Sequence, residues 1–230
     1  MNRMNWKKST GMVLLILLLA TGMYLSRDTI TGLVTGNSCL SLNGLARDNC
    51  YLEAKQCSKI GNVRLRDSCV AELAKAKKDG AVCNLIVSEQ TKAFCQEQLA
   101  ELTNNHDLCK DISDVYWKNN CNYHLAVNNN KDIYCSLISE SEQQQQCFKT
   151  IALATNNDAL CEFLQGTERE SCFNKIAVAL KDSEICQQIS LPFVRDGCRS
   201  KVARVSNDVA LCKKVVTPEI RKSCEDGFVK

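Results

Sequence analysis

Residues 83–109 read CNLIVSEQTKAFCQEQLAELTNNHDLC, and this stretch contains one full period of the pattern that decides the fold. Its three cysteines are separated by steps of 12 and then 14 residues. From Cys57 to Cys224 the same two steps alternate, apart from one 11-residue step that ends at Cys172. A fixed period of 26 residues is typical of a repeat array, in which each unit stacks on its neighbours.

Residues at equivalent positions in successive repeats, which we call columns, have the spacing of helices that are buried on one side. Each unit has a branched aliphatic residue three positions after its first cysteine, as at Ile86 and Ile112. Most units also have an aliphatic residue four positions after the second cysteine, followed by alanine, as at Leu99 and Ala100. Positions i and i+4 lie on one face of a helix, so these residues and the second cysteine form one stripe. Neither helix could bury such a stripe alone, and stacking of units is therefore expected.

Helix starts are also predicted at fixed positions in the repeat. The column seven residues before the second cysteine holds the N-cap candidates Asn62, Ser88, Asp114 and Thr217. Pro192 and Pro218 stand one residue later, at the first helical position, where proline is tolerated. Each unit is predicted to contain a short helix of about two turns, a tight turn and a longer helix of about 14 residues. The expected fold is an all-α, right-handed α-solenoid of about seven to eight 26-residue helical-hairpin repeats, preceded by one N-terminal transmembrane helix.

The cysteines have three chemical alternatives, which are disulfides, reduced core residues and metal ligands. Metal sites usually show close pairs such as C-x2-C, which are absent, and the chain has only two histidines. An even number of cysteines in an exported chain favours disulfides, so we expect no metal ion and no cofactor. The residues assigned to disulfides are Cys39, Cys50, Cys57, Cys69, Cys83, Cys95, Cys109, Cys121, Cys135, Cys147, Cys161, Cys172, Cys186, Cys198, Cys212 and Cys224.

Two regular pairing schemes are open. Bonds across the 14-residue steps leave Cys39 and Cys224 unpaired at opposite ends, whereas bonds across the 11- and 12-residue steps use every cysteine. In the second scheme both partners of a unit lie close to the turn between its two helices, so this scheme is predicted. The expected pairs are 39–50, 57–69, 83–95, 109–121, 135–147, 161–172, 186–198 and 212–224.

The first unit departs from the regular spacing. The step from Cys50 to Cys57 is 7 residues, where 14 are expected. Seven residues are close to two helical turns, so the phase of the buried stripe is kept. One continuous helix from Cys50 to Ile60 is therefore predicted as an N-terminal cap of the array.

The amino terminus has the pattern of a membrane signal. Residues 1–8 are basic, and residues 9–26 carry no charge. Such a segment makes a helix of about 27 Å, close to a hydrocarbon core of about 30 Å, so an uncleaved signal anchor is predicted over 9–26. The positive-inside rule places 1–8 in the cytoplasm, followed by a linker over 27–38 and an extracytoplasmic array over 39–230. The alternative is a secreted chain that is cleaved near Gly22.

Charge and motifs exclude several classes of function. The whole chain has a formal net charge of +3, which residues 1–28 account for, so the rest of the chain is neutral. A neutral array lacks the basic surface that nucleic acid binding requires, and no nucleic acid partner is expected. No nucleophile elbow, P-loop, zinc-protease or dinucleotide motif occurs, and no catalysis is inferred.

One disulfide in every helix pair resembles the architecture of the secreted cysteine-rich Sel1-like repeat proteins and of tetratricopeptide-like solenoids. The resemblance covers residues 39–230 and concerns architecture alone, because the 26-residue unit is shorter than a tetratricopeptide repeat and lacks its motif. The resemblance implies a scaffold for protein or envelope contacts and transfers no functional residue.

The unit that spans residues 109–134 departs most from the repeat average, because aromatic side chains gather there. Tyr116, Tyr123 and His124 are the candidate partner-binding residues, since aromatic side chains contribute a large and rigid contact area. The predicted function is a membrane-anchored extracytoplasmic repeat scaffold that mediates protein–protein or envelope interactions. The alternatives are an extracytoplasmic enzyme or enzyme subunit with a site near His106 and His124, and a purely structural envelope spacer.

Overall fold

Residues 38–229 are described by a computed structural model, and they form an all-α array of helical hairpins. The eight long helices of this region are α2 (Gly44–Glu53), α3 (Val63–Lys77), α5 (Glu89–Thr103), α7 (Val115–Asn129), α8 (Ser141–Thr155), α9 (Gly166–Leu180), α10 (Pro192–Ser206) and α11 (Pro218–Asp226). The short elements that precede them are η1 (Ser38–Ser41), η2 (Cys57–Lys59), α4 (Gly80–Cys83), α6 (Asp107–Lys110), η3 (Asp132–Leu137), η4 (Asp158–Phe163), η5 (Ile185–Gln188) and η6 (Val209–Lys214).

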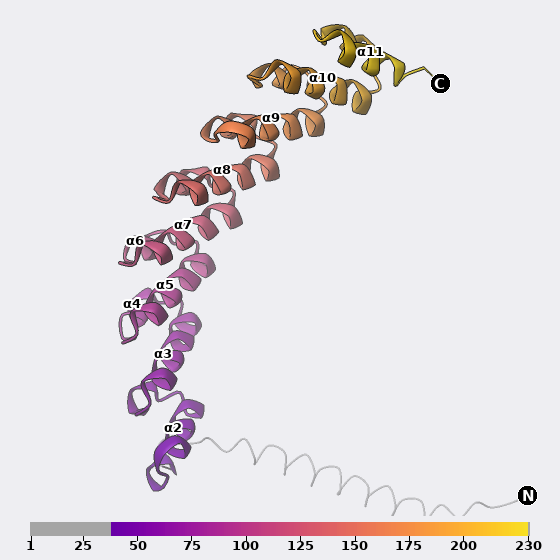
Figure 1. The fold of residues 1–230 in the computed structure, drawn as a ribbon. Coiled ribbons are helices and arrows are strands. Elements are labelled where there is room, and N and C mark those ends of the chain that lie inside the picture. The colour runs from indigo at the N-terminus through magenta and orange to yellow at the C-terminus, as the bar shows by residue number, and fades with distance from the viewer. Residues whose placement is uncertain (1–37, 230) are drawn as a thin grey trace, which may run out of the picture.

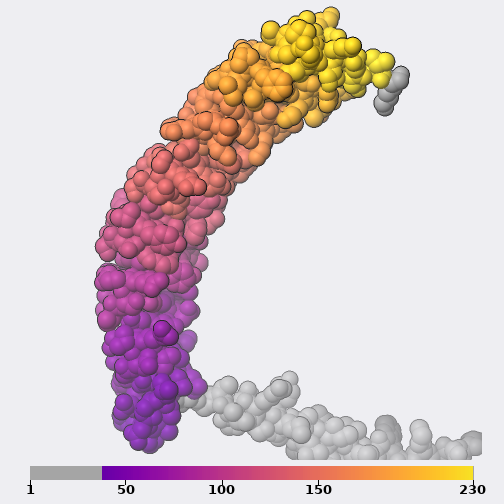
Figure 2. Space-filling view, viewed as in Figure 1, coloured from indigo at the N-terminus to yellow at the C-terminus, as the bar shows by residue number. Residues whose placement is uncertain are grey.

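Each short element and the long helix after it make one hairpin, and the hairpins stack in chain order along a curved rod (Figure 1). The short helices α4 and α6 lie along the outer, convex side of the arc, and the long helices run from that side toward the concave side. The space-filling view shows a continuous arc from the first hairpin to the last (Figure 2). The predicted array of helical hairpins is therefore confirmed.

Element lengths match the prediction for six of the eight long helices and for three of the eight short elements. The long helices α3, α5, α7, α8, α9 and α10 have 15 residues each, whereas α2 has 10 and α11 has 9. Three short elements, η3, η4 and η6, are six-residue 3₁₀ helices, which make the predicted two turns. The other five short elements have only three or four residues, so the prediction of about two turns is too long for η1, η2, α4, α6 and η5.

The predicted helix starts are mostly correct. The side chains of Asn62, Ser88 and Asp114 each accept a hydrogen bond from a backbone N–H three residues later, which satisfies a free donor of the first turn. Pro192 and Pro218 are the first residues of α10 and α11. Thr217 is at the N-cap position of α11, but its side chain makes no capping bond. Its hydroxyl donates instead to Asp196 of the previous hairpin, at 2.7 Å.

Each hairpin after the first begins with a reversal of the chain just beyond a long helix. One residue there has a left-handed backbone conformation, with φ between 52° and 56°, and these residues are Lys55, Lys78, Asn104, Asn130, Asn156, Lys181 and Asn207. After α5, for example, the N–H groups of Asn104 and Asn105 donate to the carbonyls of Glu101 and Ala100, which is the Schellman motif. Asparagine tolerates this conformation better than most residues, which suits four of the seven positions.

The first hairpin is built like the others, and the prediction of one continuous helix from Cys50 to Ile60 is wrong. Helix α2 ends at Glu53, and Lys55 has φ 54°, so the chain reverses there. The N–H of the next residue, Gln56, donates to the carbonyl of Tyr51. The seven-residue step is short because α2 has 10 residues instead of 15 and because Cys57 follows the left-handed Lys55 by two residues, whereas Cys83 follows Lys78 by five.

Each hairpin contains one disulfide, which joins its short element to the middle of its long helix. The eight disulfides are the pairs predicted from the sequence. The Cα–Cα separations are 5.5–5.8 Å, within the usual range for a disulfide. Each sulfur pair lies in the core, where twelve of the sixteen cysteines are completely buried. No cysteine of the described region is free.

The predicted stripe is buried between neighbouring hairpins. Ile112, Leu125 and Ala126 are at most 1% exposed, and the alanine column is completely buried along the whole array. A methyl side chain in this column lets one long helix approach the next closely, and the aliphatic residues fill the space beside it. Burial of this stripe is the main source of stacking free energy in a repeat array.

A second column, which the sequence analysis did not single out, also links neighbouring hairpins. It stands two residues before the second cysteine, and its side chains accept hydrogen bonds from the turn before the next long helix. We call these side chains junction acceptors; they are Asp48, Asp67, Asn119, Gln145, Glu170 and Asp196. Asp67, for example, accepts from the N–H groups of Val87 and Ser88 at 3.2 and 2.9 Å. The column therefore holds successive hairpins in register.

The predicted membrane anchor over 9–26 lies outside the described residues, as do the segments 1–8 and most of 27–38. Within residues 38–229, no helix has both the length and the apolar character that a membrane span requires.

Candidate functional site

All three predicted partner-binding residues lie on α7, in two places. Tyr116 is in the first turn and is 67% exposed, and its ring lies 5.5 Å from that of Trp117. Tyr123 and His124 lie two turns further on, with ring centroids 5.7 Å apart. Tyr123 is half-buried and packs against the hydrophobic core, so α7 does not present the three residues as one exposed patch.

The two histidines have different surroundings. His106 stacks on Tyr134 with ring centroids 4.6 Å apart, and its Nε2 lies 2.9 Å from Oδ1 of Asn122. His124 instead faces two carboxylates of α5, those of Glu97 and Glu101. Each imidazole is therefore engaged with its own set of partners.

His124 is the centre of a charged cluster between α5 and α7. Its Nδ1 lies 2.9 Å from Oε1 of Glu97 and 3.0 Å from Oε1 of Glu101. Glu97 is only 4% exposed, and the other oxygen of Glu101 accepts a hydrogen bond from Asn128 at 3.3 Å. The hydrogen bond with Glu97 raises the pKa of His124, burial opposes this, and the charges of both glutamates raise the pKa further.

Glu97 and Glu101 were not predicted as site residues, although the repeat contains a signal for them. They are four residues apart on a predicted helix, which places both carboxylates on one face. His124 stands three residues after the second cysteine of its unit, and Glu97 stands two after the second cysteine of the preceding unit. Superposing the two units by their cysteines therefore brings the three side chains to neighbouring positions.

Exposed apolar side chains gather at the turns that lead into the long helices. We call them the hairpin-turn edge; its residues are Leu85, Val87, Val115, Tyr116, Leu137, Phe163, Leu191, Phe193 and Val216, each at least 47% exposed. Tyr116 and Phe193 hold the same position in two different units, seven residues after the first cysteine. Because the turn before a long helix recurs on the same side of every hairpin, these residues line one side of the array.

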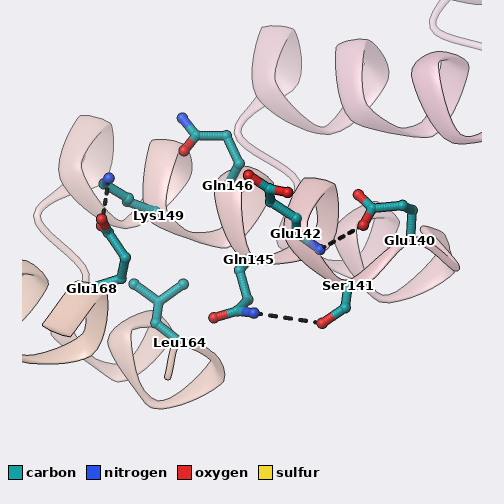
Figure 3. Close-up of a pocket in the computed structure, with 8 residues that line it drawn as sticks. All are labelled: Glu140, Ser141, Glu142, Gln145, Gln146, Lys149, Leu164 and Glu168. Atoms are coloured by element: carbon teal, nitrogen blue, oxygen red, sulfur yellow. Dashed lines mark hydrogen bonds and ion pairs between the residues drawn. The ribbon is translucent and has the colours of Figure 1, made fainter. Parts of the chain in front are cut away.

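A groove of about 400 Å³ lies between α8 and the start of α9 (Figure 3). Its polar side chains are largely paired with each other or with nearby backbone. Lys149 lies 2.5 Å from Glu168, and the carboxylate of Glu140 accepts from the N–H groups of Glu142 and Gln143 at the start of α8. Small-molecule pockets are mostly apolar, whereas Leu164 is the one apolar residue among the eight that line this groove. The groove therefore lacks the character of a small-molecule site.

Fold and surface together define an all-α array of disulfide-linked helical hairpins with an exposed apolar edge. Comparison with protein-family models, with curated proteins and with solved structures finds no match to the chain.

Proposed function

We propose that the chain is an extracytoplasmic repeat scaffold that binds a protein partner through the hairpin-turn edge and performs no catalysis. The observation that carries the proposal is the row of exposed apolar side chains on an array with no net charge. Single exposed apolar residues are ordinary, but a recurring row on one side is typical of a protein interaction surface. The eight disulfides support the compartment, because such bonds persist in oxidising surroundings outside the cytoplasm.

The proposal includes a membrane anchor over residues 9–26 that places the array outside, with residues 1–8 in the cytoplasm. Its support is the uncharged segment and the basic residues before it. We also propose that the α-solenoid is right-handed. Its resemblance to Sel1-like and tetratricopeptide-like solenoids concerns architecture alone.

Anchoring predicts how the full chain behaves in membranes. We expect the protein to stay with the membrane fraction after alkaline carbonate extraction, because a helix over residues 9–26 holds it in the hydrocarbon core. External protease should remove the array after partial reduction of its disulfides, while the same protease without reductant serves as the control. A mature chain that begins at Met23 would instead show that the array is secreted.

If a partner binds at the hairpin-turn edge, substitutions there should weaken binding, whereas substitutions at other exposed apolar positions should not. The double variant Tyr116→Ser and Phe193→Ser removes two exposed rings, each of which can contribute about 2 kcal/mol to binding, or about 30-fold in affinity. We therefore expect that photo-crosslinking in native membranes no longer gives the main adduct between the protein and its partner. The melting temperature of the variant should stay within about 2 °C of the wild type, because neither ring is buried.

The matched control is the double variant Leu102→Ser and Leu180→Ser. These leucines are 53% and 49% exposed, but they lie near the carboxyl ends of α5 and α9, away from the turns. The control should keep the crosslinked product. Loss of the product in both double variants, or in neither, would contradict binding through the hairpin-turn edge and favour a structural spacer.

A further inference from the structure

The cluster of Glu97, Glu101 and His124 is a feature that binding at the hairpin-turn edge does not use. One ligand atom from each residue lies within 4.8 Å of the other two. Two helices supply these atoms, with both glutamates on α5 and the histidine on α7. The cluster therefore joins neighbouring hairpins rather than residues of one helix.

The charges inside this cluster do not balance. A single atom, Nδ1 of His124, faces both carboxylates, at 2.9 and 3.0 Å, and it can carry only one proton. The carboxylate of Glu97 is 95% buried, and within residues 38–229 its one polar partner is His124. A buried carboxylate needs a full complement of donors or a cation, and here one N–H is shared between two negative groups. The buried carboxylate of Glu97 therefore points into a site that is short of positive charge.

The position of the cluster in the array is a second observation. Junction acceptors link six of the seven pairs of neighbouring hairpins in the described region, and the exception is the pair that contains α5 and α7. The residue at that position of α5 is Ala93, which has no polar side chain. The one junction without an acceptor is thus the junction that has the Glu97, Glu101 and His124 cluster.

We propose that Glu97, Glu101 and His124 bind a divalent transition-metal ion of the zinc class, which links α5 to α7 in place of a junction acceptor. Imidazole and carboxylate are ordinary zinc ligands, and three protein ligands with an open fourth position are common. A tetrahedral ion about 2.1 Å from each ligand atom spaces those atoms about 3.4 Å apart, so the two Nδ1–Oε1 distances need to lengthen by only about 0.4–0.5 Å. His124 is 48% exposed, so water can reach the fourth position.

Titration of the full-length, disulfide-bonded protein in detergent with Co²⁺ tests this site, since tetrahedral Co²⁺ absorbs visible light strongly. All cysteines of the described region are in disulfides, so no thiolate competes there. We expect one saturable Co²⁺ site per chain that Zn²⁺ displaces. Glu97→Gln and His124→Gln should each weaken it more than about tenfold, since loss of a supporting group alone has at least that effect. Zn²⁺ should also raise the melting temperature of the wild type and not that of either variant.

The second histidine of the chain provides the matched control. His106→Gln removes an imidazole that lies outside the cluster, so its Co²⁺ and Zn²⁺ titrations should equal those of the wild type. Each variant is first compared with the wild type in chelator, where near-ultraviolet circular dichroism reports its folding. A wild type without saturable Co²⁺ binding, or a folded Glu97→Gln variant that binds Co²⁺ as tightly as the wild type, would overturn the proposal.

Discussion

Replacing Cys109 and Cys121 together by alanine is expected to lower the free energy of unfolding by about 3 kcal/mol, within the usual range for a loop of this length. The bond connects α6 to the middle of α7, and both cysteines are completely buried. Without it, the four-residue α6 has only its apolar contacts to hold it against α7. Chemical denaturation of the oxidised protein, followed by circular dichroism, measures the change.

The location of this disulfide adds a second effect. Each hairpin of a repeat array contacts mainly its neighbours, so weakening a central hairpin lets the two halves unfold separately. We therefore expect a broader unfolding transition, in which the free energy of unfolding depends less steeply on denaturant concentration. The control is the same change at Cys212 and Cys224, in the last hairpin of the described array, which has a neighbour on one side only. A central variant that unfolds like the wild type would show that the stacked stripe alone determines stability.

Substituting the junction acceptor Asp196 by alanine is expected to lower the free energy of unfolding by about 2–3 kcal/mol. Its Oδ2 accepts hydrogen bonds from the N–H and the hydroxyl of Thr217, both at 2.7 Å. Hydrogen bonds to a charged group contribute about 1.5–3 kcal/mol, and the alanine variant leaves both donors of Thr217 without this acceptor. The exposed Asp226→Ala serves as the control and should change stability by less than about 0.5 kcal/mol.

The contribution of Asp196 should also depend on pH. Burial raises the pKa of Asp196, but the hydrogen bonds from Thr217 and Val216 and the charge of Arg199 together lower it below the ordinary value of 3.8. A lowered pKa means that the carboxylate stabilises the fold above pH 3.8 and loses this effect as the pH falls toward its folded pKa. The stability difference between the wild type and Asp196→Asn should therefore shrink below pH 3.8. A difference that stays constant between neutral and acidic pH would show that the charge of Asp196 contributes nothing.

Much of the fold could be predicted from the sequence because it depends on contacts within one unit. A disulfide such as Cys186–Cys198 and a cap such as Ser88 involve partners at most 12 residues apart, and the repeat shows each of them several times over. The error at Cys50 to Ile60 also has a local cause. The spacing of cysteines reports the phase of a helix, but a lysine gives no signal that it adopts the left-handed conformation seen at Lys55.

The candidate sites were less predictable, because they depend on which side chains of neighbouring hairpins meet. Of the candidate partner-binding residues, Tyr116 is exposed, whereas Tyr123 packs against the core of the next hairpins. The sequence shows His124 as one unusual residue, but its two glutamate partners lie 23 and 27 residues earlier and become visible only when two hairpins are placed side by side.

The sequence by itself determined the repeat period, the disulfide pairs and the approximate length of the six long helices between the first and the last hairpin, since local spacing controls all three. Only the tertiary structure decided which polar side chains cross from one hairpin to the next. Thr217 illustrates the difference, because a threonine before Pro218 is an ordinary N-cap in sequence, yet its hydroxyl donates to Asp196, 21 residues earlier. A hydroxyl bonds to the acceptor with the best geometry, and the stacking of whole hairpins, which no single unit encodes, sets where that acceptor lies.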